Sequence, residues 1–455
     1  MNIIRKKVKG LESINFVEKL ALSFHKKNIV VCVIGLGYVG LPLVTALLKQ
    51  KFRVLGFDVD QKKIDRLKKG KSYIKSFTDQ DIVAMNNSGK FNCNSDPKVL
   101  EGADVILICV PTPLTRNREP DMTYVRDTAI TIAKYLRKGQ LIVLESTTYP
   151  GTTLELILPI LQKTGLIVGK DFFLAYSPER EDPGNSKYTA GNTPKVVGAD
   201  DENSRKLAIA LYGKIVPKVV AVSSSATAEA VKITENIFRC VNIALVNELK
   251  MVFHKMGINI WEVIEAAKTK PFGFMPFYPG PGLGGHCIPI DPFYLTWKAR
   301  EYGISTRFIE LSGEINTVMP DYVIERLRDE LDKRFTKSIN GRSILLIGMA
   351  YKKNIDDIRE SPALVIFEQL LTKKAKVDYH DPYVPVIPNT REHSILVNVK
   401  SIKLNAEILK KYDAVIICTN HDCIDYELVV KHSKLVVDTR NATTHIKRID
   451  KVVFA

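Results

Sequence analysis

The residues with the most evident chemistry lie in a glycine-rich loop that carries one cysteine. Three glycines at 282–285 precede His286 and Cys287, and Asp291 follows four residues after the cysteine. A thiol with an ordinary pKa of about 8.5 is already partly thiolate at neutral pH. Backbone N–H groups around it can bind a reacting carbonyl oxygen. We interpret Cys287 as a nucleophile, with a buried thiol in a turn as the alternative.

His286 beside Cys287 also raises the possibility of a cysteine hydrolase or a metal site. Adjacent residues rarely point the same way, and no ligand cluster is evident nearby, so we expect no metal. The chain has 7 cysteines, an odd number without any CxxC pair. Reduced thiols, most of them packed in the core, fit this pattern better than disulfides.

A second group of polar residues lies on a segment that has neither Gly nor Pro, residues 224–255. Its apolar residues fall on more than one face, which predicts a long buried helix that connects domains or forms a dimer interface. Lys232 and Asn236 are spaced i,i+4 and share a face, and Arg239 continues the stripe. A cation and an amide could stabilise an oxyanion there. An ion-pair network at the dimer interface is the alternative.

The first half of the chain carries a dinucleotide-binding signature between an apolar strand and a helix. The motif GLGYVG supplies Gly35, Gly37, Tyr38, Val39 and Gly40. The glycines permit a tight turn, close approach of a pyrophosphate and close helix–strand packing. Asp58 ends the next strand, where an acid can bond the ribose hydroxyls, and this favours NAD over NADP. The alternative is a structural glycine turn.

Two further motifs fall at predicted strand ends, where open parallel sheets bind their ligands. They are Val110–Pro113 and Glu145–Thr147. We expect Thr112 and Glu145 to contact the cofactor. Turn residues, or a helix cap at Ser146 or Thr147, are the alternatives.

Alternating strand-like and helix-like segments must position these residues. Strands are expected at 29–35, 52–58, 104–110, 141–147, 172–179 and 194–200, and again at 343–351, 376–382, 413–419 and 434–440. This pattern predicts an α/β protein with two Rossmann-like parallel-sheet domains joined by a central helical dimerisation region. The expected parts are an N-terminal extension (1–27), an NAD domain (28–215), a central region with the catalytic loop (216–330) and a C-terminal domain (331–455).

Composition narrows the class of protein. With 455 residues, 45% of them hydrophobic, the chain is long enough for two or three domains. The net charge of +16 suits anionic diphosphates, and the densest basic run, Gln61–Lys71, has the spacing of a solvated helix face, so we expect no nucleic-acid partner. The uncharged stretch Ile29–Leu48 contains three glycines and a proline and predicts a strand, turn and helix rather than a membrane span. No signal peptide is visible, and we expect a cytoplasmic protein.

Taken together, the motifs resemble the UDP-glucose/UDP-mannuronate dehydrogenase family over about residues 28–445. These motifs occur in the same order as in the family. They are GLGYVG, CVPTP, EST with PGT, SPER, the Lys232/Asn236 helix, GGHC with Asp291, and Tyr351–Lys353 with Asp356 and Arg359–Ser361. The resemblance implies an N-terminal NAD domain, a dimerising helix, a C-terminal domain that holds UDP, and a homodimer.

The resemblance also implies roles for individual residues. Cys287 is the nucleophile, Lys232, Asn236 and Asp291 surround the substrate C6, and Thr147 orients a water. Glu179, in the SPER motif, closes over the sugar and assists hydrolysis. Arg359 is expected at the cofactor, and further substrate contacts are expected at Arg180, Arg239, Gly284, Lys353 and Arg440. Phe277 and Tyr278 lie in the loop that we expect to form a wall of the substrate pocket, with packing at a subunit contact as the alternative. Some relatives carry a second glutamate where this chain has Pro183, so no role transfers to that position.

The implied reaction is a four-electron oxidation of a C6 alcohol. NAD takes a hydride, Cys287 captures the aldehyde, a second NAD leaves a thioester, and water releases the acid with Asp291 or Glu179 as base. The segment from Pro271 to Ala299 resembles the branch acting on UDP-N-acetylhexosamines, above all UDP-N-acetylglucosamine. The N-acetylgalactosamine, N-acetylmannosamine and glucose nucleotides remain alternatives. A simpler β-hydroxyacid-type dehydrogenase, or a non-catalytic UDP-sugar or NAD sensor, would have no need of this set of residues.

Overall fold

The computed structural model describes residues 16–74, 77–115, 117–180, 191–285, 288–390, 392–447 and 450–455. The chain forms two compact units, the first extending to Glu235 and the second beginning at Asn236. Each unit contains its own sheet and core, and each is described by itself.

The first unit is built on an eight-stranded sheet in the order β3-β2-β1-β4-β5-β6-β7-β8. Strands such as VILI and LIVL are buried on both faces, as continuous apolar runs in a parallel sheet require. Its strands are β1 (Val30–Ile34), β2 (Arg53–Phe57), β3 (Phe91–Asn94), β4 (Val105–Ile108), β5 (Leu141–Leu144), β6 (Phe173–Tyr176), β7 (Lys195–Gly198) and β8 (Val219–Val222).

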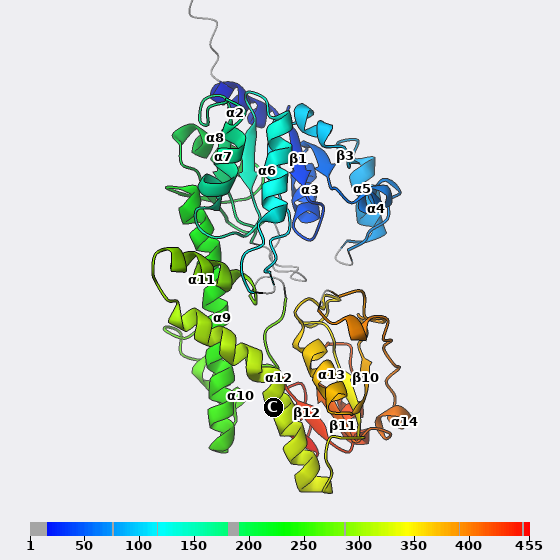
Figure 1. The fold of residues 1–455 in the computed structure, drawn as a ribbon. Coiled ribbons are helices and arrows are strands. Elements are labelled where there is room, and N and C mark those ends of the chain that lie inside the picture. Colours follow the sequence, from blue (N-terminus) through cyan, green and yellow to red (C-terminus); the bar gives the residue numbers. More distant parts are fainter. Residues whose placement is uncertain are drawn as a thin grey trace, which may run out of the picture. The chain divides into compact units, whose positions relative to one another are not determined.

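Helices cover this sheet, drawn in blue to teal in Figure 1. The helix α2 packs against α8, and Leu20 and Phe24 of α2 are buried in the core of the unit. The helical elements are α2 (Phe16–Lys26), α3 (Gly40–Lys49), α4 (Gln61–Lys68), α5 (Asp79–Asn87), η1 (Pro97–Gly102), α6 (Thr123–Tyr135), η2 (Thr153–Ile157), α7 (Leu158–Gln162) and α8 (Glu202–Tyr212).

A single long helix, α9 (Ser225–Lys255), follows β8 and matches the helix predicted at 224–255. The chain crosses from the first unit into the second within this helix. The helix is not buried all round in one chain, because Phe238, Leu245 and Val252 are about half exposed, at 48%, 50% and 47%.

The second unit contains a five-stranded sheet in the order β10-β9-β11-β12-β13, and all its pairs are parallel. The strands are β9 (Ser343–Ile347), β10 (Lys376–His380), β11 (Ala414–Ile417), β12 (Val436–Asp438) and β13 (Val452–Phe454). The helical elements are α10 (Ile260–Ala267), α11 (Asp291–Glu301), α12 (Arg307–Phe335), α13 (Pro362–Thr372), η3 (Ser394–Leu396), α14 (Ala406–Leu409) and α15 (Tyr426–His432). The yellow to red part of Figure 1 shows this sheet with α12, α13 and α14.

The predicted fold class is confirmed, with one correction. The strands β6 and β7 pair antiparallel, through Tyr176 and Gly198, where an uninterrupted parallel sheet was expected. The stretch Ile29–Leu48 forms β1, the glycine turn and most of α3, as predicted. Of the helices within the described ranges, none combines the length and the apolar character that crossing a bilayer requires. The domain boundaries at 27, 215 and 330 remain predictions.

Candidate active site

The glycine motif forms the turn between β1 and α3. Gly35 has φ +88°, and a Cβ on it would lie 2.4 Å from the carbonyl oxygen of Cys109. A Cβ on Gly40 would lie 1.9 Å from the carbonyl oxygen of Gly35, so the helix and the turn pack too closely for any side chain. A Cβ on Gly37 would meet nothing within 4 Å. This open space beside the start of a helix is where the motif admits a pyrophosphate, so these residues fit a dinucleotide.

Asp58 ends the second strand region as predicted and is only 6% exposed. Its carboxylate accepts hydrogen bonds from the backbone N–H groups of Leu36 and Asp60, each at 3.0 Å. Lys63 donates to the same carboxylate at 3.2 Å. The aspartate is therefore fixed against the glycine turn, but a lysine stands beside it, a neighbour that the motif did not reveal.

The motifs at the ends of β4 and β5 are joined by Ser146. Its hydroxyl donates to the carbonyl oxygen of Val110 at 2.7 Å, so it does not cap a helix. Thr112 is buried at 4% exposure, and Thr147 is partly exposed. This hydrogen bond holds the two strand ends together at the edge where a nicotinamide is expected.

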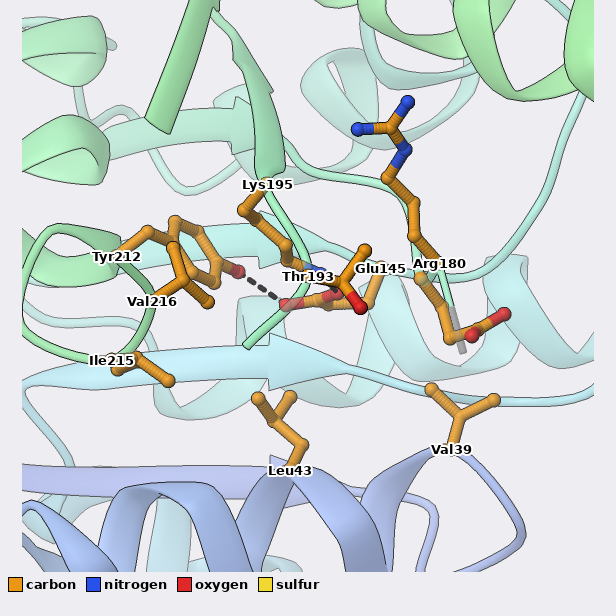
Figure 2. A pocket seen from close by; sticks show the side chains of 10 residues that line it. Val39, Leu43, Glu145, Arg180, Thr193, Lys195, Tyr212, Ile215 and Val216 are labelled. Atoms are coloured by element: carbon orange, nitrogen blue, oxygen red, sulfur yellow. Dashed lines mark hydrogen bonds and ion pairs between the residues drawn. The ribbon is translucent and has the colours of Figure 1, made fainter. Parts of the chain in front are cut away.

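Glu145 lies in a buried network that the sequence did not predict. Its carboxylate accepts from the Lys195 ammonium on one oxygen and from the Tyr212 hydroxyl on the other. Figure 2 shows both side chains converging on Glu145 in a pocket that is also lined by Val39 of the glycine turn and Leu43 of α3. Each oxygen thus has a partner within the protein, and the cofactor contact expected of Glu145 remains a prediction. Burial and the Glu145 charge raise the pKa of Tyr212 well above its usual value.

Glu179 and Lys232 meet within the first unit, and both are largely buried. The Lys232 ammonium donates to the carbonyl oxygen of Glu179 at 2.6 Å and to its carboxylate at 3.2 Å. The next residue, Arg180, forms an ion pair with Glu235 on α9 and donates to the carbonyl oxygen of Pro194 at 2.8 Å. The predicted acid and the predicted lysine are therefore direct partners.

Glu229, one turn before Lys232 on α9, is a buried acid that the sequence reading missed. It is fully buried and accepts from the Gly151 N–H at 2.5 Å, the Thr153 N–H at 2.9 Å and the Thr153 hydroxyl at 2.6 Å. Loss of solvent raises its pKa to about 7 although these hydrogen bonds act in the opposite direction. A polar residue three positions before Lys232 was the available signal.

In the second unit, Asn236 and Asp291 form a buried pair with 0% and 1% exposure. The Asn236 amide donates to the Asp291 carboxylate at 2.5 Å, and the Arg239 guanidinium donates to the Asn236 amide oxygen. Asp291 is the first residue of α11, where unpaired N–H groups favour a negative charge. The structure thus brings together three residues predicted for the site.

The helix α9 also holds the loop that leads toward the cysteine. Asn247 accepts from the Gly280 N–H at 3.0 Å, and Lys250 donates to the Gly280 carbonyl oxygen at 3.1 Å. A Cβ on Gly280 would lie 2.4 Å from the Arg440 guanidinium. Burial, with the nearby charge of Arg440, lowers the pKa of Lys250 to about 7. Arg440, predicted to bind substrate, thus packs against this loop.

The last described residues of the loop are fixed by Tyr351. A Cβ on Gly284 would lie 2.4 Å from Tyr351 Cβ, and one on Gly285 would lie 2.9 Å from its ring. The Gly285 N–H donates to the carbonyl oxygen of Arg359 at 3.0 Å. The glycine loop that precedes Cys287 in the chain is therefore in contact with the segment from Tyr351 to Arg359, which carries another of the family's motifs. Cys287 and His286 themselves, like Pro183, lie outside the described residues.

The remaining predicted contacts have partners away from the Asn236–Asp291 pair. Tyr278 stacks on Trp261 at 5.8 Å and donates to Glu265, both on α10. Phe277 makes an edge contact with Phe238 at 5.6 Å. Two basic residues form ion pairs in the C-terminal part, Lys353 with Asp422 and Arg359 with Asp357. Substrate contacts for these residues, and a cofactor contact for Arg359, remain predictions.

Comparison with known proteins gives the class. Three models of the UDP-glucose/GDP-mannose dehydrogenase family match the chain: the NAD-binding domain at residues 29–216, the central domain at 226–318 and the UDP-binding domain at 345–445. The chain therefore belongs to this family. Its activity is that of an NAD-dependent UDP-sugar 6-dehydrogenase, as the sequence predicted.

Individual relatives agree with this assignment. The chain is 37% identical over 371 residues to UDP-N-acetyl-D-glucosamine 6-dehydrogenase of Pseudomonas aeruginosa, covering 81% of this chain and 86% of that protein. It is 33% identical over 418 residues to UDP-N-acetyl-D-mannosamine dehydrogenase of Pyrococcus horikoshii, covering 90% and 95%. A solved structure of a UDP-D-ManNAc dehydrogenase from that organism superposes with a TM-score of 0.84 at 31% identity, covering 94% of this chain and 98% of that chain.

Proposed function

We propose that this chain oxidises the C6 alcohol of a UDP-N-acetylhexosamine, with UDP-N-acetylglucosamine as the preferred substrate, for surface polysaccharide or glycan precursor synthesis. Two relatives named as UDP-N-acetyl-D-glucosamine 6-dehydrogenases, at 37% and 34% identity, support this choice. The amino-acid sequence from Pro271 to Ala299, which resembles the same branch of the family, also supports it. The second candidate is UDP-N-acetylmannosamine, because relatives that bear that name reach 33% identity.

The observation that carries the catalytic proposal is the buried hydrogen bond between Asn236 and Asp291. Burying a carboxylate is costly unless it is paired, so this arrangement indicates a preorganised polar site. Asp291 lies four residues after Cys287 in the chain and begins α11. In the proposal, Cys287 captures the C6 aldehyde and later holds the acyl group as a thioester. Asn236 and Asp291 orient the C6 oxygen and the water that releases the product.

Lys232 and Glu179 supply the second part of the proposed chemistry. NAD, bound at the glycine turn, would be the hydride acceptor. Lys232, one turn before Asn236 on α9, stabilises the negative charge that develops on the C6 oxygen. Glu179 accepts a proton from the attacking water, and Thr147 orients that water. The ion pair between Lys232 and Glu179 holds both side chains in place.

The test is a competition among four UDP-sugars, those of N-acetylglucosamine, N-acetylmannosamine, N-acetylgalactosamine and glucose, with NADH absorbance as the readout. A site built for an acetamido group leaves polar groups unpaired when that group is missing, which costs on the order of 1–3 kcal/mol. We expect UDP-N-acetylglucosamine to have the highest kcat/KM and UDP-glucose to be roughly 5- to 150-fold worse. A preference for UDP-glucose would refute the proposed substrate class and leave the dehydrogenase assignment intact.

We also propose that the protein is a homodimer formed through α9. The half-exposed residues Phe238, Leu245 and Val252 are spaced by seven, so they follow one face of the helix. A face of this kind that recurs in every copy can pair with itself about a two-fold axis, which is the commonest arrangement of homo-oligomers. The second copy of this chain is therefore the occupant we assign to this stripe.

A further inference from the structure

Three polar side chains are buried together at the carboxyl end of the first sheet. Glu145 follows β5, Lys195 begins β7 and Tyr212 ends α8, and their exposures are 1%, 8% and 0%. Lys195 and Tyr212 donate to different oxygens of the Glu145 carboxylate. Figure 2 shows the three groups side by side in one pocket.

Such a network is a poor device for stability alone. Taking an ammonium and a carboxylate out of water costs free energy that their attraction often fails to recover, and apolar residues of similar size are frequently as stable. The strand β7 is otherwise apolar, KVVG, so a lysine at its first position calls for another explanation. A buried polar network with all partners in place does, however, fix geometry strongly.

What the network fixes is the backbone that carries Glu179. Besides Glu145, the Lys195 ammonium contacts the Pro178 carbonyl oxygen at 2.9 Å. The Glu179 N–H donates to the Glu145 carbonyl oxygen at 3.4 Å. The peptide between residues 178 and 179 is therefore held from β5 on one side and from β7 on the other. Beyond it, the Glu179 carboxylate meets Lys232.

We propose that Lys195 and Glu145, oriented by Tyr212, are positioning residues that set the Glu179 carboxylate for release of the product from Cys287. This inference rests on the proposed function. In that step the water oxygen bonds to the acyl carbon, a water proton passes to Glu179, the carbon–sulfur bond breaks and the thiolate leaves. None of the three residues touches the substrate in this scheme. They act only through the placement of Glu179.

The test compares wild-type protein with the paired variant Lys195→Met/Glu145→Gln, which removes both buried charges together and leaves neither unpaired. Steady-state kcat is measured, and the intact mass of acid-quenched protein is determined by mass spectrometry to detect the acyl-enzyme. We expect kcat, measured at saturating NAD, to fall roughly 10- to 100-fold, because a misplaced general base loses part of the roughly 100- to 10,000-fold that such a base contributes. Acyl-enzyme should accumulate, because release is slowed and the oxidations are not. The single variant Lys195→Arg keeps the positive charge, so its kcat should lie between that of the paired variant and that of the wild-type protein.

Two controls separate positioning from a general loss of structure. Lys138→Met removes an ion pair between exposed Lys138 and largely buried Asp171 in the same unit and should leave kcat unchanged. In a Glu179→Gln background, the paired change should slow turnover no further, because residues that act through one another are not additive. Unchanged kcat in the paired variant, or a fully additive loss in the Glu179→Gln background, would overturn the positioning role. Wild-type turnover is measured first, so failure of the proposed function shows in the wild-type protein itself.

Discussion

Glu229 should make the stability of the first unit depend on pH in a direction opposite to that of most carboxylates. Burial raises its pKa from 4.5 to about 7. At a pH below about 4.5, Glu229 is protonated in both the folded and the unfolded protein. Between about pH 4.5 and 7, Glu229 is ionised in the unfolded protein and protonated in the folded protein. The folded protein therefore binds one more proton than the unfolded protein, and its stability falls as pH rises. At about 1.4 kcal/mol per pKa unit, the full loss is roughly 3 kcal/mol.

The perturbation is Glu229→Gln, which keeps the shape and cannot ionise. The measured quantity is the unfolding temperature of the wild type minus that of the variant. We expect this difference to fall by several degrees between about pH 5 and about pH 8, because 1 kcal/mol corresponds to roughly 2–4 °C for a unit of this size. Differential scanning calorimetry on both proteins measures this, and titrations common to both cancel. Glu202→Gln, at an exposed ion pair with Lys206, is the matched control and should show no such trend. A pH-independent difference between wild type and Glu229→Gln would refute the buried, proton-holding carboxyl.

Three further outcomes are expected. Asp58→Ala should lower the preference for NAD over NADP by at least about tenfold, because a repulsion of about 1.4 kcal/mol toward the 2′-phosphate is removed and Lys63 remains; an unchanged ratio of kcat/KM values would contradict the ribose contact. Asn236→Ala should reduce kcat roughly 100- to 1000-fold with circular dichroism unchanged, since one donor to the developing oxyanion is lost; a loss of only a few-fold would make the Asn236–Asp291 pair structural. Leu245→Glu should yield monomers by light scattering, because a charge is placed in the middle of the α9 stripe; an unchanged molar mass would place the interface elsewhere.

Local patterns were sufficient for the parts of the site that depend on neighbouring residues. The glycine turn, Asp58 at a strand end and the helix at 225–255 are all set by short-range steric and periodic constraints. The polar stripe of Asn236 and Arg239 was readable because residues three and four apart share a helix face.

Contacts between distant segments could not be predicted in the same way. Lys195 and Glu145 are 50 residues apart, and nothing in either segment names the other as its partner. The antiparallel pairing of β6 and β7 has the same cause, since strand direction is decided by how the chain returns to the sheet. The partners of Tyr278 on α10 were not predictable either: its ring stacks on Trp261 and its hydroxyl donates to Glu265, while its expected substrate contact remains a prediction.

The most direct test of the proposed chemistry is the number of NADH molecules formed per UDP-N-acetylglucosamine consumed. Limiting sugar is incubated with excess NAD, NADH is measured by absorbance, and the product is identified by mass spectrometry. A nucleophilic Cys287 that retains the aldehyde predicts two NADH per sugar and a uronic acid as the only product. One NADH per sugar, with free aldehyde in solution, would contradict it.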